Sequence, residues 1–258
     1  MSGTPSIREG FARFAFSGGV KPSASRVLAG RRIPIGMPTK QGCPVVEESL
    51  TMGDMKVAVV DLIRIPGAEI YYEEHFLPPE EATQFFEMLM SKCAWQRRKT
   101  SFGYPVPRDE AYYGDASADY TYSRRDYEPL PWIQELLTLK ARVEQATPPA
   151  AYPKSGLPNL GYNAVLCNLY RNGNDSVGLH ADAEPEMGPV IASVSLGAER
   201  LFRLKPKDGS VAFSAKLPHG SLLIMAGKTQ KNFKHEVPKE PGVTQPRINL
   251  TFRRIEQK

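Results

Sequence analysis

The chain has 258 residues, of which 41% are hydrophobic and 24% are charged, proportions typical of globular proteins. It contains no apolar run near the roughly 20 residues that a membrane-spanning helix needs, so a transmembrane protein is excluded and we expect no membrane partner. Its three cysteines are widely spaced and include no CxxC pair, which excludes a disulfide framework and a thiolate zinc site and favours a reducing compartment.

The first 46 residues carry the whole of the net charge of +5, because they hold seven basic residues and one acidic residue. They are rich in Ser, Gly and Pro, so we expect residues 1–50 to form a disordered basic tail. Three roles stay open for it: a nonspecific phosphate-binding arm, an Arg-rich organelle transit peptide, or a solubilising tail without a specific role. We expect an intracellular protein, nuclear if its source is a eukaryote, or an organellar one if the tail is a transit peptide.

Residues 51–258 are expected to form a single domain that starts near Lys56. Apolar alternation predicts two strands on either side of a Pro66-Gly67 turn, and a helix that opens with a proline should follow and pack on a sheet. A turn-rich aromatic stretch and a second helix come next, so we assign residues 68–145 to a lid with helices. The predicted ranges are 57–64 and 68–76 for the strands, 79–90 for the first helix, 95–131 for the turn-rich stretch and 131–145 for the second helix.

From residue 160 to the end, short alternating segments are separated by Gly, Pro, Asn and Asp. Eight short strands without intervening helices predict an antiparallel sandwich or barrel. Together with the two earlier helices they indicate a mainly β fold with flanking helices (α+β), whose β core covers residues 160–258 and is buttressed on one side. The predicted strands are 162–170, 177–181, 190–196, 200–204, 211–216, 221–225, 234–237 and 247–254.

His180 and Asp182 give the first chemical signal. Positions i and i+2 of a strand project from the same face, so the imidazole and the carboxylate could bind one metal ion, although such pairs are more often loop residues without a metal. Either His219 or His235 could complete the set. His235 is favoured because it lies in a strand, whereas His219 stands between Pro and Gly at a turn. Two histidines and one carboxylate are the ligands of non-haem Fe(II) enzymes. The fourth histidine, His75, is expected to be structural.

The last predicted strand has one apolar face, which must enter the core, and one polar face. The polar face is either the solvated side of an ordinary half-buried strand or a pocket in which two guanidiniums grip the ends of a small dicarboxylate. An amide and a phenol on the strand over 162–170 point together and could complete that pocket. The polar face consists of Arg247, Asn249, Thr251 and Arg253, and the amide and phenol belong to Asn168 and Tyr170.

Taken together, these motifs resemble the AlkB family of Fe(II)- and 2-oxoglutarate-dependent nucleic-acid dealkylating dioxygenases, in particular its animal-type DNA repair homologues. The resemblance extends from about residue 63 to residue 254 and implies the family's double-stranded β-helix, or jelly roll, for the core. The motifs in chain order are Asn168-x-Tyr170, His180-x-Asp182, Ala192 to Gly197, His219-Gly220-Ser221-Leu222, His235 and Arg247-x-Asn249-x-Thr251-x-Arg253.

The resemblance implies a role for each of these residues. His180, Asp182 and His235 would bind Fe(II), which leaves His219 as a turn residue. With O2, the cosubstrate 2-oxoglutarate would be converted to succinate and CO2, while an N-methyl group on a base is hydroxylated and lost as formaldehyde. The residues implied to hold 2-oxoglutarate are Arg247 and Arg253, helped by Asn168, Tyr170, Asn249 and Thr251.

Alkylated DNA is the substrate that the resemblance implies, with 1-methyladenine and 3-methylcytosine as candidate lesions, and we expect a monomer. A duplex base must be flipped out, stacked on an aromatic side chain and replaced by a wedge. Tyr120 and Tyr122 match the family's base-stacking positions and Phe102 its hairpin tip, with core packing as the alternative for each aromatic ring. Where these repair branches carry an acidic pair after the metal-binding Asp, this chain has Ala183-Glu184, so only Glu184 remains to contact the base and the preferred base is open.

Two other functions are weighed against DNA demethylation. One is an AlkB-like oxygenase that acts on RNA or on protein, and the other is a nucleic-acid-binding module that has lost catalysis. The complete set of ligands argues against the second. The basic cluster Arg97-Arg98-Lys99 either meets phosphates next to the hairpin tip or forms a solvated face.

Overall fold

The computed structural model describes residues 61–100, 103–122, 125–151, 161–207 and 212–256. All of them belong to one unit, Met52–Lys258. The predicted basic tail over residues 1–50, the predicted beginning of the first strand and the hairpin-tip residue Phe102 lie outside the described residues. None of the described helices is long and apolar enough to cross a membrane.

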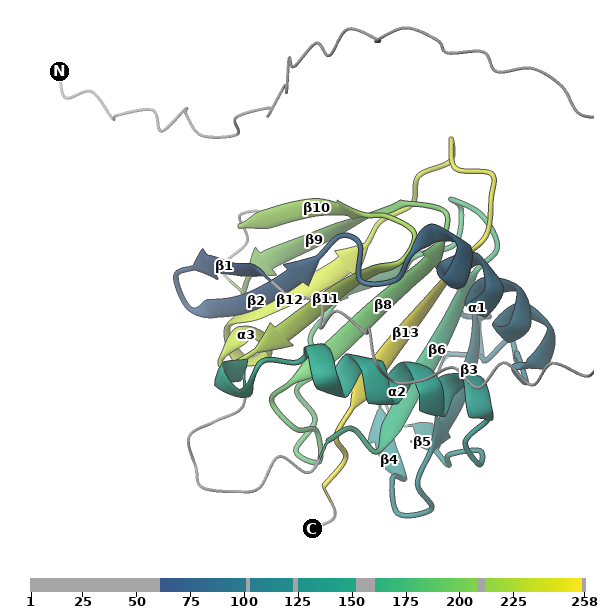
Figure 1. Ribbon diagram of the computed structural model, residues 1–258, viewed down its shortest axis with the longest axis horizontal. Helices are drawn as coiled ribbons and strands as arrows, with labels where there is room; N and C mark the ends of the chain where they lie inside the picture. The colour runs from purple at the N-terminus through teal and green to yellow at the C-terminus, as the bar shows by residue number, and fades with distance from the viewer. Residues whose placement is uncertain (1–60, 101–102, 123–124, 152–160, 208–211, 257–258) are drawn as a thin grey trace, which may run out of the picture. The chain divides into compact units, whose positions relative to one another are not determined.

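The larger of two main sheets has seven antiparallel strands in the order β1-β2-β11-β8-β13-β6-β3. Strands far apart in the sequence are therefore neighbours, and the last strand of the chain, β13, lies in the middle of the sheet (Figure 1). The bounds are Asp61–Ile65 for β1, Ala68–Glu73 for β2, Asp109–Gly114 for β3, Ala164–Tyr170 for β6, Ile191–Gly197 for β8, Ser221–Ala226 for β11 and Arg247–Arg253 for β13.

The smaller sheet has four antiparallel strands in the order β10-β9-β12-β7. A separate two-stranded hairpin is formed by β4 and β5. Two antiparallel sheets that share one core are the arrangement expected of a jelly roll. The bounds are Val177–His180 for β7, Arg200–Pro206 for β9, Phe213–Leu217 for β10, Phe233–Val237 for β12, Tyr120–Tyr122 for β4 and Arg125–Tyr127 for β5.

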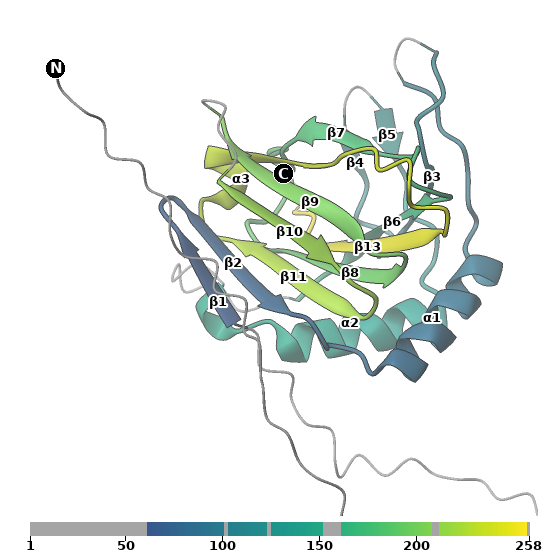
Figure 2. The ribbon, with the colours of Figure 1, turned by 90° about the horizontal axis from the view of Figure 1, so that it is seen from above.

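Two helices, α1 (Pro79–Lys92) and α2 (Gln134–Ala146), cover one side of the larger sheet, and the smaller sheet lies on the other side (Figure 2). The helix α1 begins with a proline and has acidic residues in its first turn and a lysine in its last, as the helix dipole favours. Its buried residues pack with those of α2 and with the apolar side of the sheet in one large core, which confirms the predicted buttress. Side chains between the two sheets form a second, smaller core.

The two faces of β13 enter different environments. Ile248, Leu250 and Phe252 are part of the helix-side core. The polar residues that alternate with them are also buried, since none of the seven residues of the strand is exposed. The interpretation of this polar face as a solvated surface is therefore wrong, and its residues line a pocket instead.

The eight predicted strands of the C-terminal half all appear, with ends that shift by up to a few residues. Five elements were not predicted: the strands β3, β4 and β5, the short helix α3 and a 3-10 turn. The strand β3 completes the edge of the larger sheet, although the stretch that contains it was expected to be only turn-rich, because its charged Glu110 and the following Gly-Asp break the apolar alternation. The short helix α3 (Thr229–Asn232) is only four residues long, too short for helical periodicity to show. A 3-10 turn, η1, covers Pro149–Ala151.

Candidate active site between the sheets

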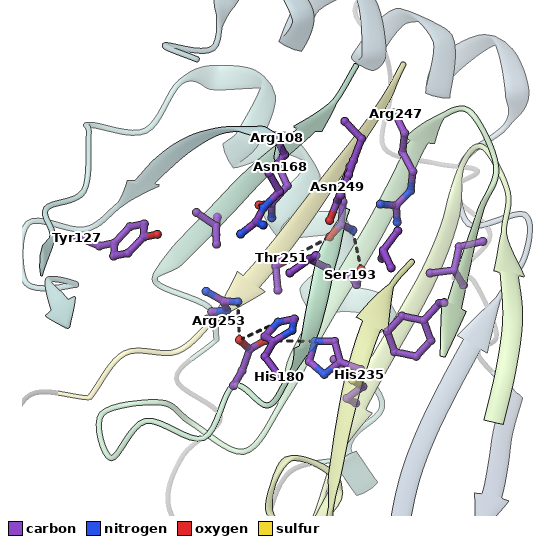
Figure 3. Close-up of a pocket in the computed structure, with 18 of the residues that line it drawn as sticks. Arg108, Tyr127, Asn168, His180, Ser193, His235, Arg247, Asn249, Thr251 and Arg253 are labelled. Atoms are coloured by element: carbon purple, nitrogen blue, oxygen red, sulfur yellow. Dashed lines mark hydrogen bonds and ion pairs between the residues drawn. The ribbon is translucent and has the colours of Figure 1, made fainter. Parts of the chain in front are cut away.

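Two histidines and one aspartate meet at the open edge of the smaller sheet. His180 is the last residue of β7 and pairs in register with His235 on β12, while Asp182 follows β7 by two residues. One ligand atom of each of the three residues lies within 4.8 Å of the others. The Nε2 atoms of His180 and His235 are 3.8 and 3.9 Å from the Asp182 carboxylate oxygens. Figure 3 shows the two histidine rings next to each other. The structure thus brings together the three residues that the sequence predicted as metal ligands.

Each ring is held in a defined orientation. The Nδ1 atom of His180 is 2.8 Å from the Gly178 carbonyl oxygen, so Nδ1 carries the proton and Nε2 presents its lone pair. The ring of His235 stacks on Phe202, with the ring centroids 5.6 Å apart. The Asp182 backbone N–H donates to the Gln230 side-chain oxygen at 3.0 Å. Packing and hydrogen bonds therefore aim three donor groups at one point.

The protonation states of His235 and Asp182 suit the binding of a divalent cation. Burial and the neighbouring His180 lower the pKa of His235 to about 3, although Asp182 opposes this. Burial alone would raise the pKa of Asp182, but Arg253 and the two histidines lower it to about 2. At neutral pH His235 is therefore a neutral imidazole and Asp182 a carboxylate, which are the forms that bind a metal ion.

The donor set fits Fe(II). Two imidazoles and one carboxylate match the facial triad of non-haem iron enzymes, which leaves positions open for further ligands. Among the described residues, Asp182 Oδ2 and His235 Nδ1 are buried without a hydrogen-bond partner. A buried carboxylate oxygen without a partner is costly unless a cation occupies the position beside it.

The polar face of β13 forms one wall of a pocket next to this triad (Figure 3). Arg247 is almost fully buried; its Nη2 donates to Ser195 Oγ at 3.0 Å and its guanidinium lies 5.2 Å from the Tyr170 ring. Its Nε and Nη1 have no partner among the described residues, and burial lowers its pKa. A buried cation with free donors calls for an anion, so the pocket is built to accept a small carboxylate beside the triad.

The middle of that wall is already ordered by internal hydrogen bonds. The Asn249 amide donates to Ser193 Oγ at 2.7 Å and to the Val194 carbonyl at 3.1 Å. The Thr251 hydroxyl donates to Asn249 Oδ1 at 3.2 Å. Both residues line the pocket, and their predicted contact with 2-oxoglutarate stays a prediction.

Arg253, at the other end of the wall, lies against the triad. Its Nη2 is 3.0 Å from Asp182 Oδ1, and its Nη1 donates to the Tyr120 hydroxyl at 3.0 Å. Burial by itself would lower the pKa of Arg253, but Asp182 and Tyr120 raise it. Arg253 was predicted to contact the cosubstrate alone, whereas in the structure it also pairs with Asp182 of the triad.

The structure describes only some of the side chains that were predicted to bind the substrate. Tyr120 is buried and stacks on Tyr127, with the ring centroids 5.2 Å apart, and both line the pocket; its role in base stacking stays a prediction. Glu184 is half-buried, and burial together with Asp182 raises its pKa. Tyr122 belongs to β4, but its side chain is outside the described part of the structure.

The remaining residues singled out in the sequence have structural contacts. His219 lies in a turn, where its Nδ1 accepts the Gly197 backbone N–H at 2.8 Å, as predicted for a turn residue. In the basic cluster, Arg97 pairs with Asp109 at 2.5 Å. The guanidinium of Arg98 lies 4.4 Å from the Tyr127 ring centroid. Part of this cluster therefore packs on the lid rather than forming a wholly solvated face.

Sequence reasoning missed three residues near the pocket: Arg108, Glu110 and Tyr127. Arg108 and Tyr127 line the pocket, and Glu110, on β3, binds both of them. They belong to the stretch that reads as turn-rich, and no spacing there marks them. Only the charged pair at positions 108 and 110, which would share one face of a strand, could have given a signal.

The chain is similar in sequence to a known protein family and to several known proteins. The family described as the 2OG-Fe(II) oxygenase superfamily matches residues 69–253. The mouse protein named alpha-ketoglutarate-dependent dioxygenase alkB homolog 3 is 41% identical over 195 residues, which cover 70% of this chain and 64% of that protein. The human protein named DNA oxidative demethylase ALKBH2 is 35% identical over 209 residues, which cover 75% of this chain and 76% of that protein.

A solved structure, that of OsALKBH1, is similar in fold. It superimposes with a TM-score of 0.54 and covers 76% of this chain and 99% of that one, at 20% sequence identity. At this identity the match supports the fold alone, and it agrees with the predicted jelly roll.

Proposed function

The chain belongs to the AlkB family within the 2OG-Fe(II) oxygenase superfamily, and we propose that it removes N-linked methyl groups from alkylated bases in DNA. The observation that carries this proposal is the His180, Asp182 and His235 triad at the end of a buried pocket with Arg247 inside it. The complete triad argues against a binding module that has lost catalysis. The human relative named DNA oxidative demethylase ALKBH2 supports DNA as the substrate.

In this proposal, different residues of the chain bind the metal and the cosubstrate. Iron with 2-oxoglutarate and O2 supplies the oxidation of a methyl group, and the hydroxymethyl product then loses formaldehyde. His180, Asp182 and His235 hold the iron in this proposal. Arg247 binds one carboxylate of 2-oxoglutarate through its free Nε and Nη1, and charge-assisted bonds of this kind are strong and directional.

Arg253 and Glu184 are proposed to lie between the metal site and the bound base. Arg253 holds the Asp182 carboxylate in place and lies beside the lid residue Tyr120. Glu184 has a buried Oε2 without a partner among the described residues, which can accept a hydrogen bond from the exocyclic amine of a flipped base. Because Ala183 provides no second acceptor, we propose that lesions with an exocyclic amine, such as 1-methyladenine and 3-methylcytosine, are bound through Glu184 alone.

A panel of oligonucleotides tests the substrate. The full chain is incubated with Fe(II), 2-oxoglutarate and O2 and with DNA or RNA strands that each carry one methylated base, and the products are identified by mass spectrometry. We expect restored bases and stoichiometric formaldehyde with methylated DNA, and no product with Asp182→Ala. Demethylation of RNA strands only would replace DNA by RNA as the substrate, and succinate formation without any restored base would overturn nucleic-acid demethylation.

A further inference from the structure

Glu110 is a buried carboxylate next to the pocket that does not itself line it. It is 1% exposed. Its Oε1 accepts a hydrogen bond from Arg108 Nη2 at 2.6 Å, and its Oε2 accepts one from the Tyr127 hydroxyl at 3.0 Å. An ionised carboxylate at this depth is tolerated only where such partners hold it, so Glu110 fixes the position of Arg108.

Arg108 in turn contacts a residue of the pocket wall. Its Nε donates to Asn168 Oδ1 at 2.7 Å, and Figure 3 shows the two side chains next to each other. The strand register places Glu110 directly opposite Asn168 on neighbouring strands, and Arg108 precedes Glu110 by two residues, so one guanidinium reaches both.

The identity of Arg108 determines which way the Asn168 amide faces. A guanidinium has only donors, so the amide atom beside it must be the oxygen. This leaves the amide nitrogen of Asn168 free to face the pocket, which Asn168 lines together with Arg108 and Arg247. If the amide were rotated by half a turn, its oxygen would face the pocket and would repel a carboxylate there.

We propose that Glu110 is a positioning residue which, through Arg108, holds the Asn168 amide with its N–H groups toward the carboxylate of 2-oxoglutarate. This inference rests on the proposed function, because it takes 2-oxoglutarate as the ligand of the pocket. Neither Glu110 nor Tyr127 needs to touch the ligand in this arrangement. The effect of Glu110 must then disappear when Asn168 is absent.

A double-mutant cycle on binding tests this without any turnover. The affinity of the full chain for 2-oxoglutarate is measured by calorimetry with Mn(II) in place of iron, for the wild type, Glu110→Ala, Asn168→Ala and the double variant. A misplaced amide loses a hydrogen bond to the charged carboxylate of 2-oxoglutarate, so we expect Glu110→Ala to weaken binding about tenfold in the wild-type background. In the Asn168→Ala background we expect a change of less than about twofold, because coupled residues are not additive.

The outcomes separate this inference from the proposed function. Equal losses in both backgrounds would show that Glu110 acts independently of Asn168, for instance because Arg108 contacts the ligand directly, and would overturn the inference. Failure of the wild type to bind 2-oxoglutarate would instead overturn the proposed function.

Two further variants complete the experiment, one as a matched control and one as an alternative to Glu110→Ala. Glu128→Ala removes an exposed acidic residue that directly follows Tyr127 in the sequence and should leave the affinity unchanged. If Glu110→Ala does not fold, Glu110→Gln keeps an oxygen acceptor for Arg108 and should weaken binding by only about two- to threefold, because a neutral acceptor bonds less strongly than an ionised one. An unchanged affinity in a folded Glu110→Ala protein, or a loss in Glu110→Gln as large as that in Asn168→Ala, contradicts the inference.

Discussion

The Arg253 guanidinium and the Asp182 carboxylate lie 3.0 Å apart, so the last strand of the chain directly contacts the triad of His180, Asp182 and His235. The same guanidinium donates to the Tyr120 hydroxyl, on the β4–β5 hairpin. One residue thereby connects the triad, the wall of the pocket and the lid.

Replacing Arg253 by Lys should weaken metal binding. A lysine keeps the charge but has no planar fork, so it cannot bind Asp182 and Tyr120 in the same way. Losing a partner that orients a metal ligand typically costs about 10- to 100-fold in metal affinity, and we expect a loss of this size in a Mn(II) titration. The matched control is Arg254→Lys, one residue further on. An affinity for Mn(II) in Arg253→Lys within twofold of the wild type would speak against the orienting role.

Replacing Arg247 by Met should separate stability from cosubstrate binding. The guanidinium is buried, and its Nε and Nη1 lack partners among the described residues. An apolar residue of similar length removes an incompletely compensated charge, so the free energy of unfolding of the ligand-free protein should rise by about 1 kcal/mol. Urea denaturation measures this change, and 2-oxoglutarate should no longer raise the midpoint. A less stable variant that still responds to 2-oxoglutarate would contradict the assignment.

Acid should destabilise the metal-free protein through His235. Its pKa is about 3 in the folded protein and 6.5 for an ordinary histidine, so between these values the unfolded chain binds a proton that the folded chain does not. The free energy of unfolding must then rise with pH across this window, by up to about 1.4 kcal/mol per pH unit from this group. Denaturation of the wild type and of His235→Gln at a series of pH values isolates the contribution as their difference. Identical slopes for the two proteins between pH 3 and 6.5 would refute it.

Deleting residues 1–46 tests the phosphate-binding role of the basic tail. Each phosphate that the protein neutralises adds about 0.9 to the slope of log affinity against log salt concentration for duplex DNA. If the tail binds phosphates, the deletion should flatten this slope in a binding titration of unmodified DNA at several salt concentrations. An unchanged slope would favour a solubilising tail.

The sequence was sufficient for the parts of the site that lie on regular strands. The alternation along 247–253 follows directly from the period of two in a strand, and the structure places its apolar residues in the core. His180 and Asp182 were expected to project from one face of a strand, but β7 ends at His180 and Asp182 lies just beyond it, where the two side chains still meet. The structure also places His235, and not His219, beside His180 and Asp182, because the turn directs His219 toward the Gly197 backbone.

The contributions of Arg108 and Glu110 could not be predicted in the same way. They depend on the pairing of β3 with β6, a contact between residues at least fifty positions apart, whose partners the local sequence does not specify. The contact between Arg253 and Asp182 was missed for a similar reason. Arg253 lies on β13 of the larger sheet and Asp182 follows β7 of the smaller sheet, so their contact depends on how the two sheets pack.

The most direct measurement is an anaerobic Fe(II) titration of the full chain in the presence of 2-oxoglutarate, followed by the visible charge-transfer band between the two. We expect one band that saturates at one iron per chain in the wild type and is absent in His180→Ala, Asp182→Ala and His235→Ala, each of which keeps a folded circular dichroism spectrum. A wild type without this band, or a band of full intensity in any of the three variants, would contradict a single iron site formed by these residues.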